Sequence, residues 1–99
     1  MTDEAILFAL KRVVDPELGI NVVDLGLVYH AAQVADGIDV ALTMTTPSCP
    51  LGEMIVDEAR MALHDQFPEA ENIRVELVWD PPWSPDRLSE DARRQLGLS

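Results

Sequence analysis

The dipeptide Asp36-Gly37 stands between two apolar runs and predicts a tight turn. The run before it, LVYHAAQV at residues 27–34, reads as a strand, and IDVALTMT at residues 38–45 reads as the strand that returns. In the second run apolar and polar or small residues alternate, as they do in a strand with one buried face. The apolar residues are Ile38, Val40, Leu42 and Met44. We therefore predict a β-hairpin with a two-residue loop.

Helical periodicity on both sides of the hairpin predicts two helices. The first is capped by Thr2, ends near Asp15 because Pro16 follows, and leaves DPELGINVVDLG at residues 15–26 as an ordered loop. The second starts after Pro50 and ends at Phe67-Pro68. The first apolar stripe is Ile6, Leu7, Leu10, Val13 and Val14. The second is Leu51, Ile55, Ala59, Ala62 and Leu63, with Met54 and Met61 beside it as core filler.

A third strand is predicted over NIRVELVW at residues 72–79, with Ile73, Val75, Leu77 and Trp79 on one face. The order strand, helix, strand implies a right-handed crossover and parallel pairing with the strand at residues 38–45. Ser84-Pro85 begins a last helix that is capped near Gly97. The expected fold is a two-layer α/β (α+β) sandwich, helix–hairpin–helix–strand–helix, with a small mixed three-stranded sheet. Residues 1–99 form a single domain.

Composition restricts the class of partner. The sequence has seven Lys and Arg and eighteen Asp and Glu, which give a net charge of −11. This charge argues against a nucleic acid as the partner, because phosphate groups require a basic surface. No apolar run approaches the length of a membrane span, and the N-terminus has acids where a signal peptide has bases. The single cysteine cannot form an internal disulfide. We expect a cytoplasmic protein with a reduced thiol and no membrane partner.

That cysteine, Cys49, lies in TMTTPSCPLGEM between two prolines, where a strand ends and a helix begins. If Ala35 pairs with Ile38, the residue numbers of every pair sum to 73. Tyr29 then faces Met44, Leu27 faces Thr46, and the same rule extended brings Asp24 opposite Cys49. We therefore predict that VVDLG and TTPSCP meet at one end of the sheet.

Cys49 also falls at the N-cap of the second helix, with Pro50 in its first turn. A helix dipole alone lowers a thiol pKa of about 8.5 only slightly, and nearby acids such as Asp24 and Glu53 oppose ionisation. A bound metal removes the thiol proton outright, so the site suits a cation or an iron–sulfur fragment. One cysteine cannot fill a four-thiolate site, so we predict transient binding or binding shared by two chains. The alternative is that Cys49 is a small buried apolar residue.

Other polar residues have two interpretations each. Asp15 and Glu17 either cap the loop or point into the Cys49 site, and Thr45 and Thr46 either satisfy loop backbone groups or offer donors to a ligand. His30 and His64 are interpreted as exposed, and Trp79 as core. Trp83 either packs the last helix down or presents an aromatic surface to a partner.

Three segments together resemble the PaaD/SufT-like family of metal–sulfur (iron–sulfur) cluster biosynthesis proteins: VVDPELGINVVDLGLVY, TMTTPSCPLGEMI and WDPPWSPDRLSEDARRQLG. The resemblance implies a small α/β domain that assists iron–sulfur cluster maturation or insertion into client apoproteins. It places the family's cysteine on Cys49 and its hydroxyl pair on Thr45 and Thr46. Its acidic loop falls on Asp15, Pro16, Glu17, Asp24, Leu25 and Gly26. It also implies a homodimer. PaaD-type proteins carry extra cysteines in a C-terminal extension, which this sequence lacks.

Three functions follow. The first is an accessory factor in iron–sulfur assembly, in which Cys49 contacts iron or sulfur transiently and no cofactor is stably bound. Its partners are the assembly machinery and client apoproteins. The second is a thiol-dependent enzyme, although no general base is found near Cys49. The third is an acidic docking adaptor with a structural Cys49 and Trp83 on the partner surface.

Overall fold

The computed structural model of the chain describes residues 3–16, 18–45 and 51–97. Their helices and strands, in chain order, are α1 (Glu4–Leu10), β1 (Val14–Asp15), β2 (Ile20–Asn21), β3 (Val28–Val34), β4 (Gly37–Leu42), α2 (Leu51–Gln66), β5 (Asn72–Leu77), the 3₁₀ turn η1 (Pro85–Arg87) and α3 (Glu90–Gln95).

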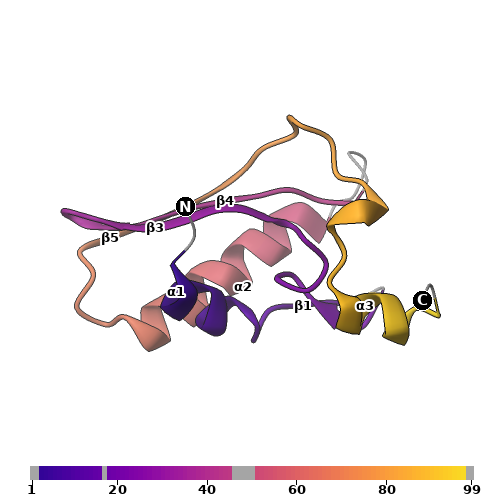
Figure 1. The fold of residues 1–99 in the computed structure, drawn as a ribbon. Helices are drawn as coiled ribbons and strands as arrows, with labels where there is room; N and C mark the ends of the chain where they lie inside the picture. The colour runs from indigo at the N-terminus through magenta and orange to yellow at the C-terminus, as the bar shows by residue number, and fades with distance from the viewer. Residues whose placement is uncertain (1–2, 17, 46–50, 98–99) are drawn as a thin grey trace.

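The main sheet has the strand order β3-β4-β5. β4 pairs with β3 antiparallel and with β5 parallel, as the crossover predicted. Helices α1 and α2 lie against one face of the sheet, and the segment after β5 rises on its other side (Figure 1). The predicted two-layer fold with a mixed three-stranded sheet is confirmed.

The predicted register between β3 and β4 is wrong. Val34 pairs with Gly37, so Ala35 and Asp36 form the loop, and a bulge between Val28 and His30 shifts the ladder once more. Near the end of β4, Thr43 N donates to Leu27 O at 2.8 Å. Leu27 therefore faces Thr43 instead of Thr46. Tyr29 stands at the bulge and does not pair with Met44, and the extension that set Asp24 opposite Cys49 used the wrong register.

The close approach of β5 explains why position 37 is a glycine. Gly37 pairs with Asn72 across the parallel ladder, and a Cβ on Gly37 would lie 1.7 Å from Asn72 O. Asn72 N also donates to Asp36 O at 3.0 Å. Glycine at position 37 is therefore required by a neighbouring strand, whereas the sequence pattern attributed it to the turn.

The first helix is shorter than predicted. Its N-cap is Asp3, whose Oδ1 accepts hydrogen bonds from Ala5 N at 2.9 Å and Ile6 N at 3.2 Å, while Thr2 lies outside the described residues. The helix ends at Leu10 instead of near Asp15, because Val14–Asp15 pairs antiparallel with Ile20–Asn21. The predicted loop therefore contains a short two-stranded ladder.

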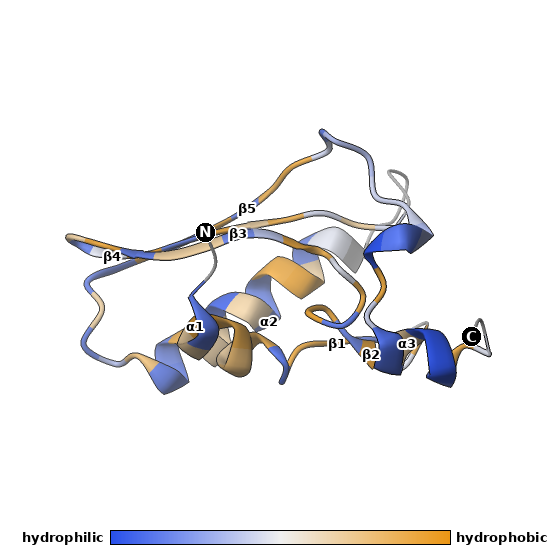
Figure 2. Cartoon of the chain, viewed as in Figure 1, coloured by the Kyte–Doolittle hydropathy of each residue, from blue (hydrophilic) through white to orange (hydrophobic). Residues whose placement is uncertain are grey.

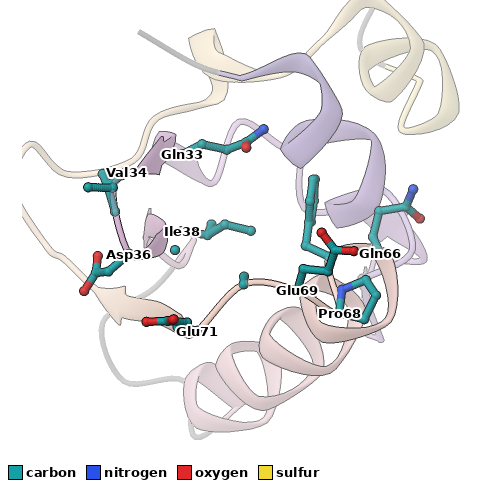
Figure 3. Close-up of a pocket in the computed structure, with 12 residues that line it drawn as sticks. Gln33, Val34, Asp36, Ile38, Gln66, Pro68, Glu69 and Glu71 are labelled. Carbon is teal, nitrogen blue, oxygen red and sulfur yellow. The ribbon is translucent and has the colours of Figure 1, made fainter.

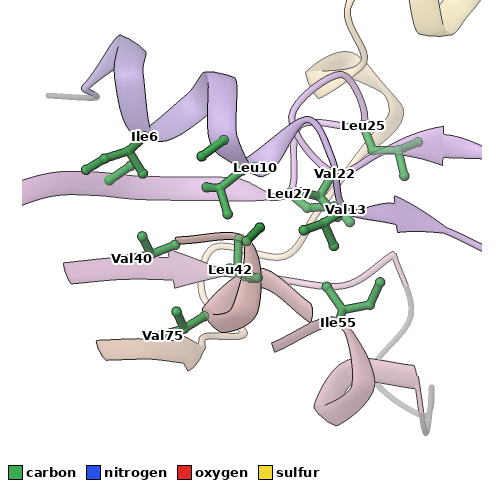
Figure 4. Packing of buried hydrophobic residues seen from close by; sticks show 14 of the residues in the cluster. Ile6, Leu10, Val13, Val22, Leu25, Leu27, Val40, Leu42, Ile55 and Val75 are labelled. Carbon is green, nitrogen blue, oxygen red and sulfur yellow. The ribbon is translucent and has the colours of Figure 1, made fainter. Parts of the chain in front are cut away.

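The core lies between the sheet and the helices α1 and α2. Figure 4 shows Val40 and Leu42 of β4, Val75 of β5 and Ile55 of α2 meeting there. The predicted α2 residues Ile55, Ala59, Ala62 and Leu63 are all buried. Burying an aliphatic side chain of this size stabilises the fold by about 1.5–3 kcal/mol.

Three residues that the sequence assigned to the core are exposed: Met54 by 40%, Met61 by 67% and Trp79 by 44%. At 3.6 residues per turn, the two methionines fall on the side of α2 opposite Leu63. Trp79 lies beyond Leu77, the last residue of β5. Hydrogen bonds to β4 therefore no longer determine which face of the sheet its side chain occupies. His30 and His64 are exposed, as predicted.

The C-terminal segment is split in two. Ser84-Pro85 begins only the single turn η1, and α3 starts at Glu90 with Ser89 Oγ accepting from Ala92 N at 3.1 Å. Both elements are hydrophilic, whereas apolar residues recur in α1 and the strands (Figure 2). The helix ends just before Gly97, as predicted. In the part of the chain that the structure describes, no helix has the length and apolar character needed to cross a membrane.

Candidate functional site

The predicted site residues divide into two groups. Asp15, Asp24, Leu25, Gly26, Thr45 and Trp83 lie within the described residues. Glu17, Thr46, Cys49 and Pro50 lie outside them. The described part of the site therefore consists of the acidic loop, the end of β4 and the contacts that hold these two segments together.

Asp24 is fixed by a reciprocal pair of hydrogen bonds with Asn21. Asn21 Nδ2 donates to Asp24 Oδ2 at 2.8 Å, and Asp24 N donates to Asn21 Oδ1 at 2.9 Å. Asn and Asp often close loops in this way. Sequence reasoning missed Asn21, although an Asn three residues before an Asp in a turn-rich loop is a recognisable signal. The carboxylate stays half-buried and keeps acceptor capacity for a further ligand.

Residues 22–27 connect β2 to β3, and we call them the Asp24 loop. This loop runs beside the carboxyl end of β4. Leu27 N donates to Val22 O at 3.0 Å, and Leu27 O accepts from Thr43 N at 2.8 Å. Thr45, two residues further on, is half-buried. The acidic loop and the end of β4 therefore do lie together at one end of the sheet, although the register that predicted it was wrong.

Thr43 is a residue that sequence reasoning did not select. Its side chain is 1% exposed, and its Oγ1 is buried without a hydrogen-bond partner among the described residues. A buried polar group left unpaired costs about 1–3 kcal/mol. The alternating pattern at residues 38–45 predicts that Thr43 lies on the face away from the core, so its burial was not expected.

Asp15 is the other polar residue that is buried in the described part of the chain, with 3% exposure. Its Oδ1 accepts from Leu18 N at 3.3 Å, and its carbonyl accepts from Gly19 N at 2.8 Å. Both bonds close the turn between β1 and β2. Of the two interpretations open for Asp15, these contacts support loop capping.

The C-terminal segment, residues 78–97, closes onto the Asp24 loop. Trp83 Nε1 donates to Leu25 O at 2.7 Å, and Ser89 N donates to Asp24 O at 2.8 Å. Gly26 has φ +75°, and a Cβ there would lie 2.3 Å from Arg87 O. The loop is thus held from both sides, by Asn21 within it and by the C-terminal segment across it.

Two further contacts anchor the C-terminal segment to β3. Tyr29 Oη donates to Pro81 O at 2.8 Å, and the Arg87 guanidinium stands 4.5 Å from the centre of the Tyr29 ring. Trp83 is half-buried against the core. Its hydrogen bond and its packing support the first of its two interpretations, that it packs the C-terminal segment down.

One hollow among the described residues lies away from the Asp24 loop. A cavity of about 580 Å³ lies at the β3–β4 turn, bordered by the end of α2 (Figure 3). Asp36, Glu69 and Glu71 line it. Arg74 pairs with Asp36 at 3.0 Å and with Asp39 nearby, and the Arg74 hydrogen bond lowers the pKa of Asp36. Since β4 runs from this turn toward Thr43, the cavity is at the opposite end of the strand from the Asp24 loop.

No group of three or more His, Cys, Asp or Glu arranged to hold a metal occurs within residues 3–16, 18–45 and 51–97. The described residues therefore supply hydrogen-bond acceptors and a fixed frame, with Asp24 held by Asn21 in the loop that bonds to Thr43 at the end of β4. Any thiolate ligand that this chain supplies must be Cys49, because it is the chain's single cysteine.

Comparison with known proteins gives consistent results. The "Fe-S protein maturation auxiliary factor YitW" of Bacillus subtilis is 46% identical over 96 residues, covering 96% of this chain and 93% of that protein. The "Fe-S protein maturation auxiliary factor SufT" of Staphylococcus aureus is 42% identical over 88 residues, covering 88% of this chain and 99% of that protein.

A crystal structure of a domain of unknown function (DUF59) from Bacillus anthracis superposes with a TM-score of 0.90 at 37% identity, covering 97% of this chain and 92% of that one. Residues 3–77 match a family described as "Iron-sulfur cluster assembly protein". The chain belongs to this iron–sulfur cluster assembly family.

Proposed function

We propose that the protein is an auxiliary factor in the maturation of iron–sulfur proteins, and that Cys49 contacts iron or sulfur transiently during delivery to client apoproteins. Both relatives named above are called maturation auxiliary factors, and each aligns over nearly its whole length. The cargo is a substrate in this proposal, and no cofactor is stably bound.

The observation that carries the proposal is the fixed Asp24 loop beside the end of β4. Two segments flank Cys49 in sequence: the end of β4, which is bonded to the loop through Thr43, and α2, which begins at Leu51. Residues 46–50 join Thr45 to Leu51, so in sequence Cys49 comes four residues after Thr45 and two before Leu51. The remaining candidates in this region are Thr46 and Pro50, and Glu17 in the β1–β2 turn.

The chemistry requires a ligand exchange without oxidation or reduction. When the Cys49 thiol coordinates iron it releases its proton, and when the cargo leaves the thiol takes a proton back. Asp24 near the cargo supplies negative charge that favours a cation. One thiol leaves most coordination positions of a cluster open, so the other ligands come from the client or from a second copy in a homodimer.

The proposal places the protein in the cytoplasm, where thiols stay reduced. It also treats the protein as a carrier. The competing thiol-enzyme function requires a base beside Cys49. Residues 21–27 and 43–45, which make up the described part of this region, contain no His or Lys that could act as such a base.

A complementation experiment tests the proposal. Cells that lack the protein receive the wild type, Cys49→Ser or Glu69→Gln, the last as a control at an exposed residue by the β3–β4 turn, at the opposite end of β4 from the Asp24 loop. The measured quantities are the activity and iron content of iron–sulfur dehydratases, with protein abundance checked by immunoblot. We expect Cys49→Ser to behave like the empty vector at normal abundance. Full client iron content with Cys49→Ser would refute the role of the thiol.

A further inference from the structure

The outer face of α2 combines exposed methionines with acids. Met54 is 40% exposed and Met61 is 67% exposed. The two are seven residues apart, which is two helical turns or about 10.5 Å along the axis. Asp57, Glu58 and Asp65 fall between or beside them on the same side of the helix. The opposite side of α2 packs into the core against the sheet, so this face is the outward side of the helix (Figure 1).

A shallow hollow adjoins Met61. Its volume is about 310 Å³, and Met61, Val14 and Glu58 line it between the start of β1 and α2. Val14 is 43% exposed. An ion pair between Arg12 Nη2 and Asp65 Oδ2, 3.3 Å long, stands at the rim. The hollow therefore combines apolar side chains with the charged groups of Arg12, Glu58 and Asp65.

The charge of this face is strongly biased. Between Leu51 and Gln66 the sequence has four acids and one arginine, Arg60. Asp57 is paired with Arg60 at 3.6 Å and Asp65 with Arg12. Glu53 and Glu58 are exposed and have no ion pair among the described residues. The surplus negative charge beside the methionines matches a partner that carries both apolar and basic residues.

From this complementarity we propose that the outer face of α2 is a docking site for a basic amphipathic helix of a partner protein. Methionine side chains are flexible and polarizable and adapt to the irregular face of a helix. The Met54–Met61 spacing matches the i, i+7 anchors of such a helix. Lysines and arginines along its edges face Glu53 and Glu58. This surface contains none of the residues that the iron–sulfur proposal uses, so the two proposals stand or fall separately.

The test uses two designed fluorescent peptides of the same leucine–lysine composition. One is an amphipathic helix, and the other is scrambled so that it has no apolar face. Binding to the full-length protein is measured by fluorescence anisotropy at two salt concentrations. We expect the amphipathic peptide to bind more tightly than the scrambled one. Chemical-shift changes in ¹⁵N-labelled protein are expected on the outward residues of α2 and at Val14.

Two double variants separate the apolar and the electrostatic contributions. Met54→Gln with Met61→Gln keeps the charge and is expected to raise the Kd of the amphipathic peptide about tenfold, leaving the scrambled peptide unaffected. Glu53→Gln with Glu58→Gln is expected to raise the Kd and flatten its salt dependence. The matched control, Glu69→Gln with Glu71→Gln, changes the charge equally at the other end of α2 and is expected to leave binding near the wild-type value.

Three results would overturn the proposal. Equal affinity for the two peptides would show that charge alone is recognised. Chemical-shift changes confined to the β3–β4 turn would place binding elsewhere. A wild type that sediments as a dimer, with the methionine double variant monomeric, would show that a second copy of this chain covers the face instead. Far-UV circular dichroism of each variant confirms that the fold is retained.

Discussion

Gly26→Ala is expected to release the C-terminal segment from the Asp24 loop. Gly26 has φ +75°, a left-handed conformation that costs an alanine about 1–2 kcal/mol. The new Cβ would also lie 2.3 Å from Arg87 O and 2.8 Å from Arg87 C, both backbone atoms that cannot move aside without displacing η1. Overpacking of this kind costs about 1–3 kcal/mol more. The total expected loss in the free energy of unfolding is about 2–5 kcal/mol.

Gly19→Ala is the matched control. Gly19 has φ +70°, close to that of Gly26, but nothing within the described residues lies within 4 Å of a Cβ there. It therefore reports the conformational cost alone, about 1–2 kcal/mol. The reduced entropy of the unfolded chain favours alanine about equally at both sites and cancels in the comparison.

Urea unfolding followed by far-UV circular dichroism measures both variants. The difference between them, about 1–3 kcal/mol, isolates the contact with Arg87. In thermal unfolding it corresponds to a melting temperature at least about 4 °C lower for Gly26→Ala than for Gly19→Ala. If the two variants lose the same stability, the C-terminal segment does not press on the loop, and the account of how Asp24 is held is wrong.

Three other changes test the remaining contacts. Trp83→Phe removes the indole donor to Leu25 O, and urea unfolding is expected to show a loss of about 1–3 kcal/mol because that buried carbonyl is left unpaired; an unchanged midpoint would contradict the bond. Thr43→Val removes a buried hydroxyl without a partner among the described residues, so the same measurement is expected to show equal or higher stability, and a loss above about 1 kcal/mol would show that the hydroxyl is used. Arg74 lowers the pKa of Asp36, so the pair stabilises the fold above the unfolded pKa of about 3.9 and this contribution is lost as pH falls through the lower folded value. An NMR titration of Asp36 is expected to show its pKa rising in Arg74→Gln, and an identical titration would refute the pairing.

The order and type of the main elements could be predicted because each has a clear period. The alternation from Ile38 to Leu42 and the α2 positions Ile55, Ala59, Ala62 and Leu63 are local signals that burial confirms. The pairing register of β3 and β4 could not be predicted, because a glycine after an aspartate is required either by a tight turn or by a neighbouring strand that approaches closely. At Gly37 the cause is the approach of Asn72, which is 35 residues away in sequence by subtraction of the two residue numbers.

The same limit applies to the site. The sequence predicted that the Asp24 loop and the end of β4 lie at the same end of the sheet, because the two strands of a hairpin run side by side in opposite directions. It could not show that Ser89 and Trp83 bond to the loop, since nothing in a local pattern indicates what a C-terminal segment contacts. It placed Met54 and Met61 in the core because methionine is usually buried, whereas the helical rotation turns them outward.

The central claim is that Cys49 contacts the cargo, and anaerobic reconstitution tests it most directly. Wild type and Cys49→Ala are each incubated with ferrous iron, sulfide and a thiol reductant and desalted. Iron and sulfide are counted, and transfer to an apo-ferredoxin is followed by absorbance. We predict that the wild type carries iron and sulfide and transfers them, and that Cys49→Ala does neither. Equal iron content and equal transfer by the two proteins would contradict the account.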